Sequence, residues 1–242
     1  MLLRSWISSP IFFVYYMLST LLFGAIGPFA IVLLPERYRQ PLLNVHNRGL
    51  LCMFCWLCGV KVEIIGREHI PKNRPVVLVA NHQSEWETYM LQILIAPVTT
   101  VLKKELLSIP FFGWGLRMVN PIAIDRSKRT NALKQIMSQG KERLENGTSV
   151  LIFPEGTRTK PTEEKEFNKG AAMLATSAKA PILPLVHNAG YAWPSKSFLK
   201  HSGTIRLVIG PMIESEGKKT SELHNEVEQW MRAEMASLPK KA

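Results

Sequence analysis

The chain opens with one long apolar stretch and then changes to shorter apolar runs separated by polar ones. From Ile11 to Leu34 no side chain is charged, and this length exceeds the roughly 20 residues that a helix needs to cross a bilayer. A second apolar piece, Gly49–Val60, is too short to span alone, but it extends a helix that we expect to begin near Leu42. Residues 1–59 are therefore predicted to form a membrane-embedded two-helix hairpin. Gly27-Pro28 allows a kink, so a tilted span and a hairpin dipped into one leaflet both remain open.

Beyond residue 60, short runs rich in β-branched residues alternate with amphipathic stretches. The expected strands are Val60–Ile65, Pro75–Ala80, Val98–Leu102, Pro121–Ile124, Ser149–Phe153, Ile182–Val186 and Thr204–Ile209. One helix is expected from Ser127 to a stop at Asn146-Gly147, and a last helix follows Ser221 as its N-cap. Strands that alternate with helices of this length predict an α/β domain over residues 60–242, with a mixed, mainly parallel sheet flanked by helices.

Basic residues outnumber acidic ones, which gives a net charge of +11 and a pI near 9.7. Nucleic acid, an anionic membrane surface and phosphorylated small molecules all fit this balance. We expect no nucleic-acid partner, because the chain lacks a motif of interleaved aromatic and basic residues. Arg37, Arg39 and Arg48 follow the first apolar stretch, whereas Arg4 precedes it. This bias places the α/β domain on the cytoplasmic face of the membrane, whether the hairpin spans or lies in one leaflet.

The cysteines Cys52, Cys55 and Cys58 have the spacing C-x2-C-x2-C. This spacing is compatible with an iron–sulfur or zinc site, but the chain has 3 cysteines in all, so no fourth one completes the ligand set. The simpler interpretation is a row of small apolar residues along one helix face. We therefore expect no metal site, and unpaired thiols agree with a reducing compartment.

The most informative local stretch is VLVANHQSEWETYML, in which His82 follows a buried strand. The exits of such strands are where α/β proteins place active sites. Ser84 followed by Glu87 also has the pattern of a capping box, which would give the glutamate a structural role. Glu85 would face His82 in a continuous helix, whereas Glu87 would face it if the helix begins after Ser84. On local evidence the catalytic and structural interpretations, and both glutamates, remain open.

A second informative stretch is SVLIFPEGTRTK, where a β-run ends in a turn. Gly156 would let the backbone approach a ligand closely, and Arg158 offers a planar guanidinium suited to phosphate. Without further information this is a turn with an exposed arginine, and many such arginines lie at the surface without binding anything.

Taken together and in this order, NHQSEWE and FPEGTR resemble the first and third motifs of the glycerolipid acyltransferase family. The resemblance covers residues 60–212. It implies that His82 is the catalytic base, because it matches the histidine of the first motif, NH-x4-D. It also implies that Glu87 is the acidic partner rather than Glu85, although the family usually has Asp at this position.

The resemblance further implies a set of substrate-binding residues. VNPIAIDR partly matches the second motif, FPEGTR is intact, ILPL is similar to the fourth motif, and KKEL resembles a segment whose first lysine faces the phosphate. The substrate-binding residues implied in this way are Lys103, Arg126, Glu155, Gly156, Arg158 and Pro184.

The reaction implied by the resemblance moves a fatty acyl group from a thioester to the free hydroxyl of lysophosphatidic acid, which yields phosphatidic acid. The expected donor is acyl-CoA or acyl carrier protein, and no cofactor is expected. Because no G-x-S-x-G nucleophile elbow is found, His82 is expected to activate the hydroxyl directly. Three alternatives remain: an acyltransferase for another lysolipid such as lyso-ornithine lipid, a hydrolase, and a non-enzymatic basic protein of the membrane surface.

Overall fold

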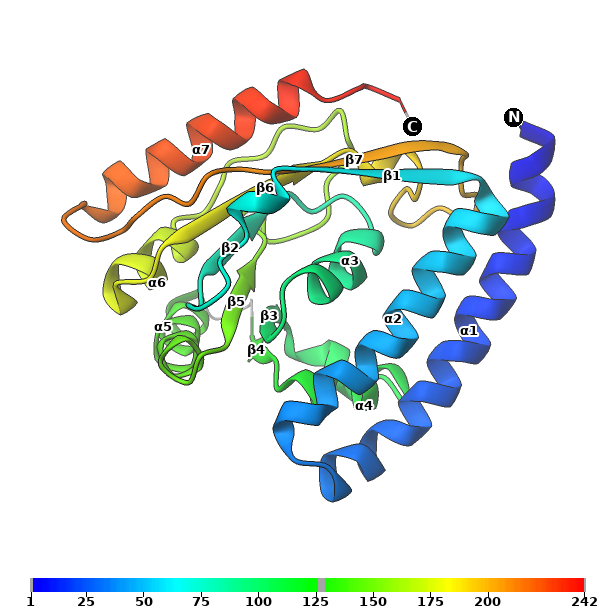
Figure 1. Cartoon of the computed structure of the whole chain (residues 1–242), viewed down its shortest axis with the longest axis horizontal. Coiled ribbons are helices and arrows are strands. Elements are labelled where there is room, and N and C mark those ends of the chain that lie inside the picture. The colour runs from blue at the N-terminus through cyan, green and yellow to red at the C-terminus, as the bar shows by residue number, and fades with distance from the viewer. Residues whose placement is uncertain (1, 126–128, 242) are drawn as a thin grey trace.

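The computed structural model describes residues 2–125 and 129–241, and its sheet lies between two layers of helices (Figure 1). The strands are β1 (Val60–Ile65), β2 (Val77–Ala80), β3 (Val98–Lys103), β4 (Ile122–Ile124), β5 (Ser149–Ile152), β6 (Ile182–His187) and β7 (Gly203–Ile209). Their order is β1-β7-β6-β2-β5-β3-β4, and within the described ranges the pairs are parallel apart from β6 with β7. The predicted mixed, mainly parallel sheet is thereby confirmed, and each predicted strand overlaps an observed one.

The helices are α1 (Leu2–Leu33), α2 (Glu36–Cys58), α3 (Trp86–Leu94), α4 (Phe112–Leu116), α5 (Arg129–Glu145), α6 (Gly170–Ala178) and α7 (Thr220–Ser237), with short 3-10 helices at Arg67–His69, Lys104–Ser108, Arg117–Val119 and Ala189–Tyr191. Helices α1, α2 and α3 cover one face of the sheet, and α5, α6 and α7 cover the other (Figure 1). Ser127, the expected start of the fifth helix, lies outside the described residues.

Strand β2 occupies the centre of the sheet and is buried on both faces. Val77 and Val79 pack into the apolar cluster under α5, α6 and α7, whereas Leu78 and Ala80 pack into the cluster under α1, α2 and α3. This alternation follows from the two-residue period of a strand. A strand covered on both faces has apolar residues at every position, which is why VLVA was recognisable in the sequence as a buried strand.

The second helix begins at Glu36 rather than near Leu42, so the prediction of its start was wrong. The polar residues before Leu42 form helix because they have specific partners. Gln40 exchanges two hydrogen bonds with the backbone of Val98, at 2.9 and 3.1 Å. Arg39 donates to two carbonyl groups at the end of α1, which otherwise have no partner within that helix.

Helix α1 lies against the α/β domain along its length. Near its start, the backbone N–H of Lys200 donates to Ser9 Oγ at 2.8 Å. Further along, Gly24 contacts the backbone of Phe111 so closely that a Cβ there would lie 2.3 Å from the carbonyl oxygen. Near its end, Ala30 packs against Met118 in a small apolar cluster. Both ends of α1 are therefore attached to the same domain.

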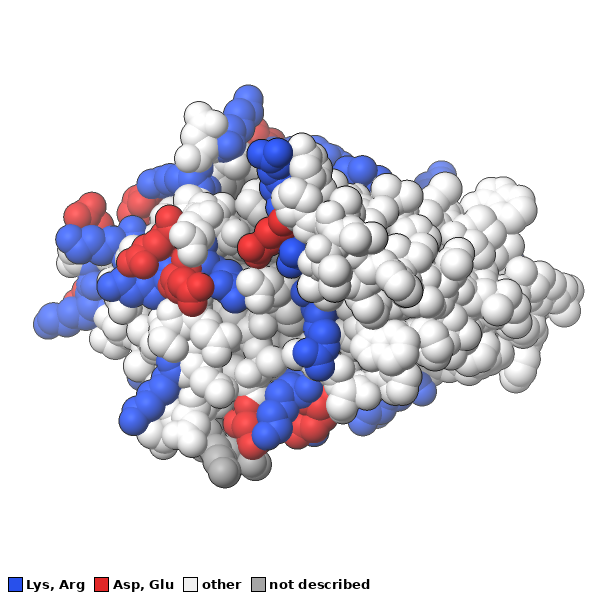
Figure 2. Space-filling model, turned by 90° about the horizontal axis from the view of Figure 1, so that it is seen from below, with Lys and Arg blue, Asp and Glu red and all other residues white. Residues whose placement is uncertain are grey.

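The outer side of α1 exposes large apolar side chains, among them Trp6, Leu18, Leu22, Phe29 and Val32. The stretch Leu3–Leu33 is long and apolar enough to cross a membrane. Seen from below, the half of the molecule that carries α1 and α2 shows a wide surface almost without charged residues (Figure 2). Exposed apolar surface of this extent indicates contact with a membrane or another apolar partner.

The last helix begins at Thr220, so Ser221 lies in its first turn and is not the N-cap that we predicted. The helix start is stabilised instead by Glu222, whose carboxylate accepts the backbone N–H of Lys219 at 3.0 Å. The observed N-cap is Lys219, two residues earlier than predicted, and the error arose because serine is the more common capping residue.

Candidate active site

Three strand ends meet at one edge of the sheet. Strand β2 pairs in parallel with β5 on one side and β6 on the other, so the carboxyl ends of all three strands lie side by side. His82 follows β2, the FPEGTR turn follows β5, and His187 ends β6. Segments far apart in sequence thus form one site, in the place where open α/β sheets bind ligands.

His82 is paired with Glu87. Its Nδ1 lies 2.7 Å from Glu87 Oε1, and the same oxygen accepts the backbone N–H groups of Gln83 and Ser84, both at 2.9 Å. Ser84 Oγ accepts the N–H of Trp86, the first residue of α3, at 2.8 Å. The helix therefore begins after His82, and Glu87 combines the two functions that the sequence left open: it anchors the helix start and holds the imidazole.

The backbone of His82 is held by the turn after β5. Its N–H donates to Glu155 Oε1 at 3.3 Å, and its carbonyl accepts the N–H of Thr159 at 2.8 Å. The imidazole also stacks on the ring of Phe153, with 4.0 Å between centroids and 13° between planes. Contacts on both sides fix the ring, and Nε2 is the nitrogen left to meet a substrate.

The Glu87 carboxylate is fully buried. Burial by itself would raise its pKa, but His187, the hydrogen bond from His82 and the N–H of Ser84 outweigh burial and lower the pKa of Glu87 to about 2. The carboxylate is therefore ionised at any physiological pH. A fixed negative charge beside Nδ1 keeps a proton on that nitrogen and stabilises the imidazolium that forms when Nε2 takes up a proton.

His187 and Asn81 belong to the site, and the sequence analysis did not identify them. The Asn81 side chain exchanges two hydrogen bonds with the backbone of His187, both at 2.9 Å, and so joins the ends of β2 and β6. The His187 ring lies 3.8 Å from Glu87 Oε2. Both residues directly follow or end a predicted central strand, and a systematic look at those positions would have found them.

His187 is buried as a neutral imidazole. Its Nε2 donates to the Asn81 carbonyl at 2.8 Å, and its Nδ1 accepts the N–H of Ala189 at 3.2 Å. One neutral tautomer satisfies both bonds. Burial lowers the pKa of His187, which agrees with the neutral form. This histidine therefore supports the strand ends and has no nitrogen available for proton transfer.

Two cations stand at the open side of His82. Arg158, which is 36% exposed, donates from Nη1 to Glu85 Oε1 at 2.7 Å. Lys103 ends β3 and lies 3.7 Å from Glu105. Glu85 therefore faces Arg158 rather than the histidine, which answers the question of which glutamate pairs with His82 in this structure.

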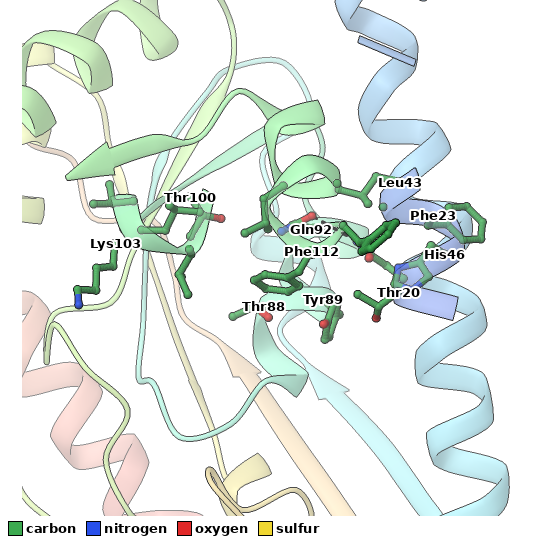
Figure 3. A pocket seen from close by; sticks show the side chains of 18 of the residues that line it. Thr20, Phe23, Leu43, His46, Thr88, Tyr89, Gln92, Thr100, Lys103 and Phe112 are labelled. Carbon is green, nitrogen blue, oxygen red and sulfur yellow. Dashed lines mark hydrogen bonds between the residues drawn. The ribbon is translucent and has the colours of Figure 1, made fainter. Parts of the chain in front are cut away.

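A cavity of about 130 Å³ extends from His82, Lys103 and Arg158 into the space between α1, α2, α3 and α4. Figure 3 shows Lys103 at one end, Phe112 near the middle, and Thr20 and His46 at the other end. Apolar side chains make up most of its wall. Three buried polar atoms on the same wall, Thr20 Oγ1, His46 Nε2 and Thr100 Oγ1, have no hydrogen-bond partner within the described part of the chain.

Glu155, Gly156 and Pro184, which were also predicted, do not line this cavity. Glu155 lies behind the His82 backbone and faces a second cavity of about 310 Å³ on the other side. Burial raises the pKa of Glu155 to about 7. Gly156 takes φ +68° in the turn, a conformation that favours glycine. Pro184 is buried within β6 opposite Val79, and Arg126 lies outside the described residues.

The cysteine row lies on α2, with Cys58 buried and Cys52 exposed. Within residues 2–125 and 129–241, no group of three His, Cys, Asp or Glu side chains is placed to hold a metal ion.

Comparison with known proteins agrees with this geometry. A model of the family described as Acyltransferase matches residues 61–188, and the chain belongs to this family. A 1-acyl-sn-glycerol-3-phosphate acyltransferase of Pseudomonas aeruginosa is 41% identical over 240 residues, which covers 96% of this chain and 91% of that protein. The Saccharomyces cerevisiae protein of the same name is 34% identical over 185 residues, or 72% of this chain and 60% of that one.

The fold also has a solved counterpart. The crystal structure of the 1-acyl-sn-glycerophosphate acyltransferase of Thermotoga maritima aligns over 99% of both chains with a TM-score of 0.81, at 24% sequence identity. At that identity the likeness establishes the fold, including the N-terminal helix pair. The resemblance inferred from NHQSEWE and FPEGTR is thereby confirmed at the level of the family.

Proposed function

We propose that the chain is a 1-acyl-sn-glycerol-3-phosphate acyltransferase, which moves a fatty acyl group from a thioester to the free hydroxyl of lysophosphatidic acid. The observation that carries this proposal is the His82–Glu87 pair, whose open side faces a largely apolar cavity with Arg158 and Lys103 at its mouth. The relatives described above, which bear the name of this activity, support it.

In the proposed reaction, His82 Nε2 takes the proton of the acceptor hydroxyl while that oxygen attacks the thioester carbonyl. The C–S bond breaks, and the leaving thiolate receives the proton from the imidazolium. Glu87 holds Nδ1 at 2.7 Å throughout. General-base catalysis of this kind contributes about 10²–10⁴ in rate, and it needs no nucleophile from the protein.

The phosphate of the acceptor is proposed to bind Arg158 and Lys103. Both side chains reach the cavity that His82 faces, so a phosphate held there places the glycerol hydroxyl near Nε2. Fixing the reactants in this way lowers the barrier by replacing a chance encounter with a defined geometry. Glu155 and Gly156 are proposed to act indirectly, by shaping the turn that presents Arg158 and holds the backbone of His82.

The acyl chain is proposed to occupy the apolar part of the cavity. Its walls include Phe23, Leu43, Phe112 and Leu116 from α1, α2 and α4, so the N-terminal helices contribute directly to the binding site. The polar atoms at the inner end, His46 Nε2 and Thr20 Oγ1, make that end less suited to a methylene chain.

The N-terminal helices are proposed to lie in one leaflet rather than to span the bilayer. Helix α1 is attached to the α/β domain near Ser9 and again near Ala30. It therefore cannot cross the membrane unless the charged α/β domain also enters the bilayer. Its exposed apolar side would enter the leaflet, with the basic domain against anionic headgroups on the cytoplasmic face. In this position the cavity opens close to lipid substrates.

The test is an acceptor screen followed by mass spectrometry of the lipid products. The purified chain would be incubated with lysophosphatidic acid or a lysolipid without phosphate, such as lyso-ornithine lipid, and with acyl-CoA or acyl carrier protein as donor. We expect phosphatidic acid from lysophosphatidic acid, and about a tenfold or greater loss of this product in Arg158→Gln. Acylation of the phosphate-free lysolipid alone would contradict the proposed acceptor, and thioester hydrolysis without acyl transfer would contradict the proposed reaction.

A further inference from the structure

The proposed phosphate arginine already has an anionic partner within the chain. Arg158 Nη1 donates to Glu85 Oε1 at 2.7 Å, and the two side chains are 36% and 23% exposed. Glu85 directly precedes α3, two residues before Glu87, but its carboxylate pairs with Arg158 while that of Glu87 pairs with His82. A carboxylate thus occupies part of the guanidinium that a phosphate would need.

The other cation at the mouth is held more loosely. Lys103 Nζ lies 3.7 Å from Glu105 Oε1, and both side chains are half exposed. A pair of this kind contributes little, so Lys103 is nearly free to meet an anion. The two cations at the mouth therefore differ: one has a close internal partner, and the other does not.

We infer that Glu85 is an internal counter-ion that occupies Arg158 in the empty site and is displaced by the acceptor phosphate. This inference rests on the proposed function, because it takes Arg158 as the phosphate ligand. The carboxylate holds the guanidinium in place before substrate arrives, and it lowers the affinity for phosphate by competing for Arg158. A weakened phosphate site also helps the product, which carries the same phosphate, to leave. Glu85 is thus a positioning residue that sets acceptor affinity.

The direct test uses inorganic phosphate as the probe and needs no turnover. The full-length chain would be titrated with phosphate at constant ionic strength, followed by phosphorus NMR. We expect Glu85→Gln to bind phosphate about two- to fivefold more tightly, the range of a partly exposed ion pair. Glu105→Gln should show a smaller gain. Glu63→Gln, which breaks the exposed pair with Arg206 at 3.0 Å on the edge strand β1, should show no change.

A double-mutant comparison tests whether the gain in phosphate affinity depends on Arg158. In an Arg158→Gln background, Glu85→Gln should no longer change phosphate affinity, because the competition that it relieves is gone. A gain that persists without Arg158 would overturn the inference, as would unchanged or weaker phosphate binding in Glu85→Gln alone. If acyl transfer is absent but phosphate binding behaves as described, then the proposed function fails while the counter-ion role stands.

Kinetics supply a readout that a purely structural role would not produce. With lysophosphatidic acid as acceptor, Glu85→Gln should lower KM by about two- to fivefold and leave kcat within about twofold. A large fall in kcat with unchanged KM would overturn the inference, because it would assign Glu85 to the chemical step.

Discussion

The catalytic edge of the sheet and the cavity beside it are built in opposite ways. At the edge, His82 has a partner for its Nδ1, its N–H and its carbonyl, and its ring stacks on Phe153. Along the cavity wall, buried polar atoms of Thr20 and His46 have no partner within the described residues. The outer surface of α1 is largely apolar and exposed. The ring and backbone of His82 are thus fixed by the protein itself, although Glu87 Oε2 and Glu155 Oε2 behind them are also buried without a hydrogen-bond partner among the described residues. The cavity wall and the outer side of α1, in contrast, are completed by something else.

This difference separates the chemistry from the binding of the lipid. A base that must accept a proton in a defined direction benefits from contacts that fix it before substrate arrives. A region that accepts a flexible acyl chain and a membrane leaves its surfaces open for those partners. Substitutions at the edge should therefore reduce the rate of the reaction, and substitutions along the cavity should alter substrate preference with small effects on folding.

The largest effect is expected from His82→Ala. Removal of the base should lower kcat for phosphatidic acid formation by about a thousandfold, and the thermal unfolding temperature should also fall, because the buried Glu87 carboxylate loses its hydrogen bond from Nδ1. His201→Ala, two residues before β7, serves as the control and should retain wild-type activity. Mass spectrometry of the lipid product would measure the loss of activity. An active His82→Ala protein would show that His82 is not the base.

The next largest effect is expected from Asn81→Ala. The change leaves the buried N–H and carbonyl of His187 without their partners, which should cost about 2–4 kcal/mol of unfolding free energy. Activity should fall as well, because the peptide before His82 is no longer fixed. Chemical denaturation compares this variant with Asn225→Ala on the exposed face of α7. Equal stability of the two variants would show that the link between β2 and β6 is not required.

A smaller, pH-dependent effect is expected from Glu155→Gln. The pKa of Glu155 is raised from 4.5 in the unfolded chain to about 7 in the folded protein. Its protonated form therefore adds stability that is fully present below pH 4.5 and is lost as pH rises through 7. The glutamine variant keeps an acceptor for the His82 N–H and does not ionise, so it should gain up to about 3 kcal/mol relative to wild type across this window. Unfolding curves at pH 5 and pH 8 with the same gain at both would contradict the raised pKa.

The smallest effect is expected on the cavity side, from His46→Leu. Its Nε2 is buried without a partner, so replacement by an apolar residue should change the unfolding free energy by no more than about 1 kcal/mol. It should also shift the donor preference toward longer acyl chains. His69→Leu is the matched control, because His69 Nδ1 lies 2.8 Å from the Ile209 carbonyl and its loss should destabilise the protein. A strongly destabilised His46→Leu would show that this end of the cavity is satisfied by the protein after all.

The sheet was predictable from sequence because its strands are short runs of β-branched residues between turns, a local property. The start of α2 was not, because Glu36–Gln40 is polar and becomes helical through partners such as Val98, which lies far away in the chain. The roles of the two glutamates also depended on distant residues. Glu85 is drawn to Arg158, 73 positions away, and only the order of the strands brings these residues together. The position of His187 directly after a predicted strand was visible in the sequence, but its partners Asn81 and Glu87 lie far away in the chain.

The central claim is that His82 acts as the base with Glu87, and not Glu85, as its acidic partner. It is tested most directly by kcat for phosphatidic acid formation in Glu87→Gln and Glu85→Gln, measured under saturating lysophosphatidic acid. We expect kcat to fall by about a hundredfold or more in Glu87→Gln, because the imidazolium loses its fixed countercharge. We expect kcat to stay within about twofold of wild type in Glu85→Gln. A larger fall in Glu85→Gln than in Glu87→Gln would show that Glu87 is not the acidic partner of His82.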